Sequence, residues 1–284
     1  MLVHFTKMHG TGNDFLVLDL VSQSVQLTPE IISALADRHT GIGFDQLLAA
    51  EPPTNPEADF FYRIYNADGS EAEQCGNGAR CLAKFVYDKQ LTPKRKLTFQ
   101  CINGLISAEL LPDNKFKINM GEPNFSPEQI PFRTPTQEDI YRLGGYPTDD
   151  QTRAAADIEF IPVSMGNPHA VVQVASVSDI QIEEIGPWLS THPVFPEGAN
   201  VSFMEIEVPG RLQLRVYERG AGETLACGTG ACAAVAVAQH RQLVSSTVDV
   251  AMPGGQITVQ WQGPNHDLFQ IGPAKKVYDG RIKI

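Results

Sequence analysis

Two stretches of the chain each place one cysteine directly before a Gly-x-Gly-Ala sequence. The first is RIYNADGSEAEQCGNGA, residues 63–79, and the second is RVYERGAGETLACGTGA, residues 215–231. The offset between Cys75 and Cys227 equals the offset between the arginines that open the two stretches, so they align residue by residue. A duplicated chain with one cysteine in each copy predicts a pseudo-symmetric site in which two equivalent sulfurs act on one ligand atom.

The Gly-x-Gly-Ala sequence predicts that each sulfur lies at, or just before, the N-terminus of a helix. Unpaired backbone N–H groups and the positive end of the helix dipole favour a thiolate there and lower the thiol pKa. The same N–H groups form a binding site for a carboxylate. If the two sulfurs lie on opposite faces of an α-carbon, a thiolate removes its proton and a thiol delivers another, which inverts the carbon.

Other functions for the cysteines are less consistent with their spacing. A zinc site is disfavoured because Cys75 and Cys81 are not at Cys-x-x-Cys spacing and no histidine cluster accompanies them, so we expect no metal. A phosphate-binding loop is disfavoured because the glycine run lacks the Lys-Ser/Thr ending. Cys81 and Cys232 lie in apolar helical segments and Cys101 in an alternating strand pattern, which is typical of inert core residues.

Length and composition limit the class of protein. The 284 residues are enough for two domains, and 42% hydrophobic with 19% charged residues is normal for a globular protein. A net charge of −11 argues against nucleic acid or an anionic membrane as partner. No apolar run approaches the roughly 18 residues of a membrane span, and the N-terminus lacks the features of a secretory signal. Five cysteines do not suggest a disulfide framework, so we expect a cytoplasmic protein.

The internal repeat extends beyond the cysteine stretches. The offset between Asn13 and Asn167 is close to the offset between the two cysteines. Gln46 and Asn200 are separated by the same offset as Asn13 and Asn167. We therefore predict two related domains, residues 1–122 and 123–273, with the tail 274–284 forming one more strand that joins the first domain. Prolines at 123, 127, 131 and 135 predict a linker or an extended arm between the halves.

The local patterns predict a mixed α+β chain. Thr28-Pro29 is typical of a helix start, and the apolar residues that follow are at helical spacing. Strands are predicted at 15–19, 60–65, 170–174 and 212–217. The segment 231–238, ACAAVAVA, is apolar on every side and must be surrounded by sheet. We expect two pseudo-symmetric domains, each a strongly curved, mainly antiparallel sheet wrapped around a central helix.

Four motifs resemble those of the diaminopimelate epimerase family. They are HGTGNDF (9–15), YNADGSEAEQCGNGARC (65–81), SMGNPHA (164–170) and YERGAGETLACGTGA (217–231). The resemblance covers essentially the whole chain, from Phe5 to Ile284. It implies interconversion of LL- and meso-2,6-diaminopimelate for lysine and peptidoglycan biosynthesis, with no cofactor, neither pyridoxal phosphate nor metal.

The resemblance also implies roles for individual residues. Cys75 and Cys227 would be the acid–base pair, with His169 and Glu218 assisting around the reacting centre. Tyr278 would lie at the interface of a homodimer. The residues implied to bind the substrate are Asn13, Gln46, Asn66, Gly76, Asn77, Asn167, Asn200, Glu218, Arg219, Gly228 and Thr229.

Two alternative functions remain open at this point. A two-cysteine racemase of proline or hydroxyproline would share the cysteine stretches but would not need so many amide side chains. An isomerase on the same fold with a carboxylate base is disfavoured, because it would lack both cysteines, which this chain has. A non-catalytic amino-acid-binding protein would use the helix starts to hold a carboxylate while the thiols stay idle, and exchange of the α-proton separates it from an enzyme.

Overall fold

The computed structural model describes residues 2–72, 75–146 and 156–284, and the chain divides into two compact units. The first unit contains the chain up to Asn119 together with Gln270–Ile284, and the second unit is Met120–Phe269. The C-terminal segment joins the first unit because its last strand pairs antiparallel with the first strand of the chain, Leu2 opposite Lys283.

The first unit combines a sheet with two helices. Its helices are α1 (Pro29–Ala36) and α2 (Gly76–Asp88). Its strands are β1 (Leu2–Gly10), β2 (Asn13–Asp19), β3 (Gln46–Glu51), β4 (Phe60–Asn66), β5 (Glu71–Ala72), β6 (Lys96–Cys101), β7 (Gly104–Leu110), β8 (Phe116–Asn119), β17 (Phe269–Gly272), which begins at the unit boundary, and β18 (Lys275–Lys283).

The second unit has the same kinds of element in the same order. Its helices are α3 (Ile182–Ser190) and α4 (Gly228–His240), with short 3₁₀ turns η1 (Pro127–Gln129) and η2 (Val177–Asp179). Its strands are β9 (Tyr141–Tyr146), β10 (Ala156–Ser164), β11 (Pro168–Gln173), β12 (Asn200–Val208), β13 (Arg211–Glu218), β14 (Gly222–Thr224), β15 (Thr247–Met252) and β16 (Gly255–Gln260).

The two sheets have the same topology. In the first unit β2–β3 and β4–β6 are parallel pairs, while β1–β2, β3–β4 and β6–β7 are antiparallel. In the second unit β11–β12 and β13–β15 are parallel, while β10–β11, β12–β13 and β15–β16 are antiparallel. This correspondence confirms the predicted α+β class with two pseudo-symmetric, mainly antiparallel units.

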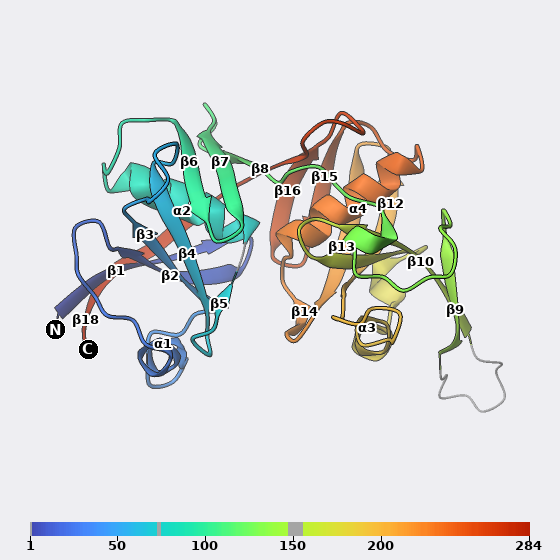
Figure 1. Cartoon of the computed structure of the whole chain (residues 1–284), viewed down its shortest axis with the longest axis horizontal. Helices are drawn as coiled ribbons and strands as arrows, with labels where there is room; N and C mark the ends of the chain where they lie inside the picture. The colour runs from blue at the N-terminus through green and yellow to red at the C-terminus, as the bar shows by residue number, and fades with distance from the viewer. Residues whose placement is uncertain (1, 73–74, 147–155) are drawn as a thin grey trace. The chain divides into compact units, whose positions relative to one another are not determined.

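One helix lies inside the curve of each sheet. Helix α2 packs against β1, β2, β3, β7 and β8, and α4 packs against β10, β11, β12, β13 and β16 (Figure 1). The apolar segment 231–238 of α4 is wholly buried, as its composition predicted. No helix among the described residues is long and apolar enough to cross a membrane.

Helix α1 begins where the sequence predicted. Thr28 is its N-cap residue, and the Thr28 hydroxyl accepts the Ile31 N–H at 3.4 Å. The stripe containing Ile32 and Leu35 is buried against residues of β1, β2 and β3. The helix therefore covers the face of the first sheet with its apolar side, as the spacing predicted.

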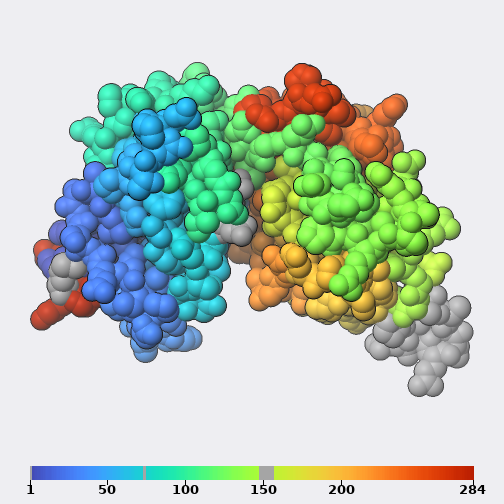
Figure 2. Space-filling view, in the orientation of Figure 1, coloured from blue at the N-terminus to red at the C-terminus, as the bar shows by residue number. Residues whose placement is uncertain are grey.

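The sequence predicted a linker or an extended arm for the proline-rich segment, and the linker is wrong because the segment belongs to the second unit. It runs over the surface of the second unit, where it appears green in Figure 2. Ile130 and Phe132 are buried in the core of that unit, with Phe132 packed edge-on against Tyr141 and Phe160. The prolines prevent a long helix, but the apolar residues between them anchor the segment by burial.

Candidate active site

The first predicted catalytic cysteine lies at the start of α2. Cys75 is the N-cap residue in an extended backbone conformation, and its Sγ accepts the N–H of Gly78 at 3.4 Å. The hydroxyl of Tyr62 donates to the Cys75 carbonyl at 3.0 Å. A Cβ at Gly78 would lie 2.2 Å from that hydroxyl, so only glycine fits in this first turn.

The second cysteine has the equivalent position on α4. Cys227 is the N-cap residue, and its Sγ accepts the N–H of Gly230 at 3.4 Å. A Cβ at Gly230 would lie 3.0 Å from a methyl group of Val216. The prediction that each sulfur lies at a helix N-terminus is therefore confirmed in both units.

Polar residues predicted from the repeat lie at the ends of three adjacent strands in each unit. In the first unit Gln46 pairs with Phe15 on one side and Asn66 on the other. In the second unit Asn200 of β12 pairs with His169 of β11. The register between β12 and β13 places Asn200 beside Glu218. We call Asn13, Gln46, Asn66, Cys75, Gly76 and Asn77 the first half-site. The second half-site is Asn167, His169, Asn200, Glu218, Arg219, Cys227, Gly228 and Thr229.

The amide of Asn13 is oriented by its neighbours in the first half-site. Its Nδ2 donates to the carboxylate of Asp45 at 2.9 Å. Its Oδ1 lies 3.7 Å from the Sγ of Cys75 and 3.5 Å from the Nδ2 of Asn77. Asn13 therefore turns its oxygen towards the thiol and the first turn of α2.

The amides of Gln46 and Asn66 bind each other. The Nε2 of Gln46 donates to the Oδ1 of Asn66 at 3.0 Å, and the Nδ2 of Asn66 donates to the hydroxyl of Ser70 at 3.1 Å. Both ends of the Asn66 amide are thus oriented within the first unit. An amide can donate two hydrogen bonds and accept two, so Asn66 can keep both bonds and still contact a ligand.

An ionic network that the sequence analysis did not assign to the site holds Asn13 in place. Asp14 accepts hydrogen bonds from buried Lys7 at 2.5 Å and from Arg38 at 2.8 Å, and Arg38 also reaches Asp45 at 2.7 Å. Burial raises the pKa of Asp14, but the hydrogen bonds from Arg38 and Lys7 outweigh it and hold this pKa well below its ordinary value. The feature of the sequence that could have indicated this network is Asp14, an acidic residue directly before the apolar strand predicted at 15–19.

Replacing Asp14 with asparagine is expected to lower the free energy of unfolding by about 3 kcal/mol at neutral pH, because it leaves buried Lys7 without its carboxylate partner. The depressed pKa contributes stability that is present above the ordinary value of 3.8 and is lost as the pH falls through the folded-state value. The difference between variant and wild type should therefore shrink in acid. Urea unfolding at several pH values measures it.

The matched control for that variant is Asp113→Asn. Asp113 forms an ion pair of 3.0 Å with Lys115, but both side chains are about half exposed. Exposed pairs contribute about 0–1 kcal/mol, so this variant should unfold close to wild type. Equal losses in the two variants would contradict the role given to the Asp14 network.

The thiol of Cys227 donates to a carboxylate in the second half-site. Its Sγ lies 3.2 Å from Glu218, whose other oxygen accepts from the Thr224 hydroxyl at 2.5 Å, and 3.5 Å from the hydroxyl of Thr229. Burial and the Glu218 charge raise the pKa of Cys227 well above its ordinary value. The sequence prediction of a lowered pKa is wrong for Cys227, because desolvation and Glu218 outweigh the helix N–H groups.

His169 is buried and neutral. Burial and the positive charge of Arg219 lower its pKa to about 3. Its Nε2 lies 3.0 Å from the Oδ1 of Asn167, so the ring donates and orients that amide. The Oδ1 of Asn200 accepts the backbone N–H of Arg219 at 2.9 Å, and the exposed Arg219 side chain donates to the Glu197 carbonyl at 2.6 Å.

The other cysteines are buried core residues, as the sequence predicted, with Cys81 and Cys232 inside α2 and α4 and Cys101 on β6. Cys81, Cys101 and Cys232 are at most 9% exposed, and burial raises the pKa of Cys81 and of Cys101 to about 12. All five cysteines are thiols. Within residues 2–72, 75–146 and 156–284, no three His, Cys, Asp or Glu side chains are grouped so that they could hold a metal ion.

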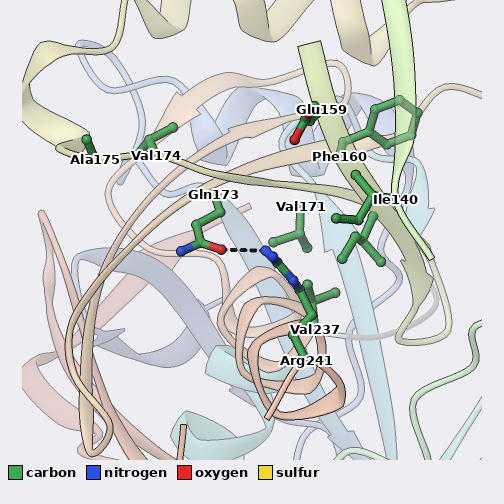
Figure 3. Close-up of a pocket in the computed structure, with 10 residues that line it drawn as sticks. Ile140, Glu159, Phe160, Val171, Gln173, Val174, Ala175, Val237 and Arg241 are labelled. Carbon is green, nitrogen blue, oxygen red and sulfur yellow. Dashed lines mark hydrogen bonds between the residues drawn. The ribbon is translucent and has the colours of Figure 1, made fainter. Parts of the chain in front are cut away.

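A cavity of about 340 Å³ lies at the opposite end of α4 from Cys227. It is lined by Val237 of α4, by Arg241 directly after that helix, and by residues of β10 and β11, and Arg241 donates to Gln173 at 2.5 Å across it (Figure 3). None of the residues predicted to bind or act on the substrate lines this cavity. It is therefore separate from the second half-site.

The fold is shared with epimerases and isomerases of known structure. A hydroxyproline epimerase from Agrobacterium vitis with bound trans-4-hydroxy-L-proline matches with a TM-score of 0.69 at 14% identity, over 99% of this chain and 92% of that one. A PhzF-family phenazine biosynthesis protein from Bacillus anthracis matches with 0.71 at 15% identity, over 100% of both chains. A methylitaconate-delta-isomerase matches with 0.66 at 15% identity, over 99% and 95%.

The chain thus has the fold of these proteins, two related units that each surround one helix. The family model of diaminopimelate epimerase matches residues 5–126 and 161–277. The chain belongs to the diaminopimelate epimerase family.

Proposed function

We propose that this protein is a diaminopimelate epimerase of the cytoplasm, which interconverts LL- and meso-2,6-diaminopimelate in lysine and peptidoglycan biosynthesis. The observation that carries the proposal is the duplicated pair of cysteine N-caps, Cys75 on α2 and Cys227 on α4. The family match over both halves supports it. So do the amides of both half-sites, which suit a substrate with two amino and two carboxylate groups.

In the proposed reaction the two thiols act on one α-carbon without pyridoxal phosphate or metal. One sulfur, as thiolate, takes the α-proton, and the electron pair of the broken C–H bond spreads onto the α-carboxylate. The other sulfur, as thiol, gives its proton to the opposite face of the carbon. The N–H groups at the two helix starts are suited to stabilise the carboxylate charge that grows in the transition state.

The hydrogen bond from Cys227 to Glu218 supports Cys227 as the proton donor in the state described here. A carboxylate acceptor 3.2 Å away and the burial of the sulfur both favour the protonated form of Cys227. Cys75 would then be the base for the isomer whose α-proton faces it. After one turnover the protonation states of the two sulfurs are exchanged, and the reverse reaction restores them.

Replacing Asn200 with aspartate is expected to raise KM about 10²-fold. The carbonyl oxygen of Asn200 is committed to the Arg219 N–H, so its amide nitrogen is the end that can donate to the substrate. Aspartate keeps the acceptor but replaces the donor with a charged oxygen that repels a carboxylate, a change of about 1.5–3 kcal/mol. Initial rates over a range of substrate concentrations measure it. An unchanged KM would remove Asn200 from the substrate site.

The experiment that tests the proposed function is incubation with LL-diaminopimelate in deuterated water. Appearance of the meso isomer with deuterium at the α-carbon is the expected result. Parallel incubations with L-proline and trans-4-hydroxy-L-proline test the racemase alternative. Binding of diaminopimelate without any α-deuterium would identify an amino-acid-binding protein and overturn the proposal.

We also propose that the protein is a homodimer with Tyr278 in the interface. Tyr278 is on β18, is 44% exposed in the single chain, and packs edge-on against Phe5 with 6.0 Å between ring centroids. Sedimentation should show a dimer for the wild type. Tyr278→Glu should shift the protein from dimer to monomer, because burying a charge in the interface without a partner for it is unfavourable. A monomeric wild type would contradict the proposal.

A further inference from the structure

A buried arginine lies in the first turns of α2. Arg80 is wholly inaccessible to solvent and is among the largest fully buried side chains. Its Nη2 donates to the Oδ1 of Asn77 at 2.7 Å, its Nη1 donates to the side-chain oxygen of Gln270, and its Nε donates to the Pro273 carbonyl at 3.2 Å. Burying a guanidinium is costly unless such contacts compensate for the lost water.

These contacts determine which way the Asn77 amide points. A guanidinium has only donors, so Asn77 must turn its oxygen to Arg80 and its nitrogen away from it. That nitrogen lies 3.5 Å from the Oδ1 of Asn13, the same oxygen that is 3.7 Å from the Sγ of Cys75. Arg80 therefore orients the donor end of an amide inside the first half-site, while its own side chain is inaccessible to solvent.

The second half-site lacks this charge at the aligned position. The repeat aligns Arg80 with Cys232, which is buried and uncharged, and aligns Asn77 with Thr229. A fixed positive charge near a thiol at a helix N-terminus favours its thiolate form. The two halves have thus diverged, with an arginine hydrogen-bonded to Asn77, two residues after the first sulfur, and the Glu218 carboxylate 3.2 Å from the second.

We propose that Arg80 is a positioning residue of the first half-site, which holds the Asn77 amide in the orientation described and favours the thiolate form of Cys75. The catalytic consequence rests on the proposed function. The effect on the reactivity of Cys75 does not, because it follows from contacts within the first unit.

The test is the rate at which iodoacetamide alkylates Cys75 in the full chain at neutral pH, followed by peptide mass mapping without substrate. Arg80→Met should lower this rate about tenfold, because it removes the charge and releases Asn77. Arg80→Lys keeps the charge and should recover most of the rate. The matched control is Arg63→Met, which removes a guanidinium of the same unit that pairs with Glu51 and Glu71 instead.

Two results would overturn the proposal. One is an unchanged alkylation rate of Cys75 in folded Arg80→Met, and the other is an equal fall in Arg63→Met. If Arg80→Met does not fold, Asn77→Leu replaces it, since it removes the side chain that Arg80 holds. A severalfold fall is then expected, and no change would count against the proposal.

A second measurement separates positioning from general damage. With LL-diaminopimelate, Arg80→Met should lower kcat about tenfold, and Arg80→Lys should recover most of it. An altered Cys75 alkylation rate in a protein that does not epimerise diaminopimelate would contradict the proposed function and leave the role of Arg80 standing. Normal epimerisation by Arg80→Met with an unchanged alkylation rate of Cys75 would contradict the role of Arg80 and leave the proposed function standing.

Discussion

Replacing Cys75 or Cys227 with alanine is expected to lower the rate of epimerisation about 10²- to 10⁴-fold, the contribution of a positioned acid–base group. In the proposed reaction each sulfur is one of two obligatory proton carriers, so neither can substitute for the other. Each sulfur also caps its helix by accepting a glycine N–H, so the loss of the cap should cost about 1 kcal/mol of stability. The rate is measured as meso isomer formed from LL-diaminopimelate.

Serine variants and a distant cysteine provide the controls. Cys→Ser at either position keeps the cap and a proton donor but supplies a poor base, so slow residual α-proton exchange is expected. Cys101→Ala removes a buried thiol from β6 that is in neither half-site and should retain wild-type activity. The two-base mechanism is ruled out if either alanine variant, at Cys75 or at Cys227, keeps about a tenth or more of the wild-type rate, because a positioned acid–base group contributes more than that.

Replacing Glu218 with glutamine is expected to lower kcat/KM about 10²-fold. The carboxylate accepts the hydrogen of Cys227, and losing a charged hydrogen-bond partner costs about 1.5–3 kcal/mol. The same change removes a negative charge that opposes ionisation of Cys227, so the pKa of this thiol should fall. Alkylation of Cys227 as a function of pH should therefore move to lower pH while catalysis becomes slower.

The control for that variant is Glu207→Gln. Glu207 lies on β12 of the same unit, forms an ion pair of 2.9 Å with Arg211, and is not in the second half-site. It should leave both kcat/KM and Cys227 alkylation unchanged. If Glu218→Gln behaves like this control, the carboxylate does not act on the thiol.

The local features of this protein follow from short stretches of its amino-acid sequence. A cysteine before Gly-x-Gly-Ala becomes a helix N-cap because the backbone of a few neighbouring residues decides where a helix starts. Thr28-Pro29 starts α1 for the same reason. The duplication also carries over to the fold, because two related sequences bury the same apolar positions and pair their strands in the same order.

Contacts between residues that are far apart in the sequence, and the pKa shifts that such contacts cause, depend on the tertiary structure. Ile130 and Phe132 join the second core although prolines flank them, since burial of apolar surface outweighs a locally extended preference. The partners of Arg80 at 270 and 273 come from the other end of the chain. The pKa of Cys227 rises because the fold removes water from the thiol and brings Glu218 to it. Desolvation and charge proximity are set by packing, and sequence spacing alone does not encode them.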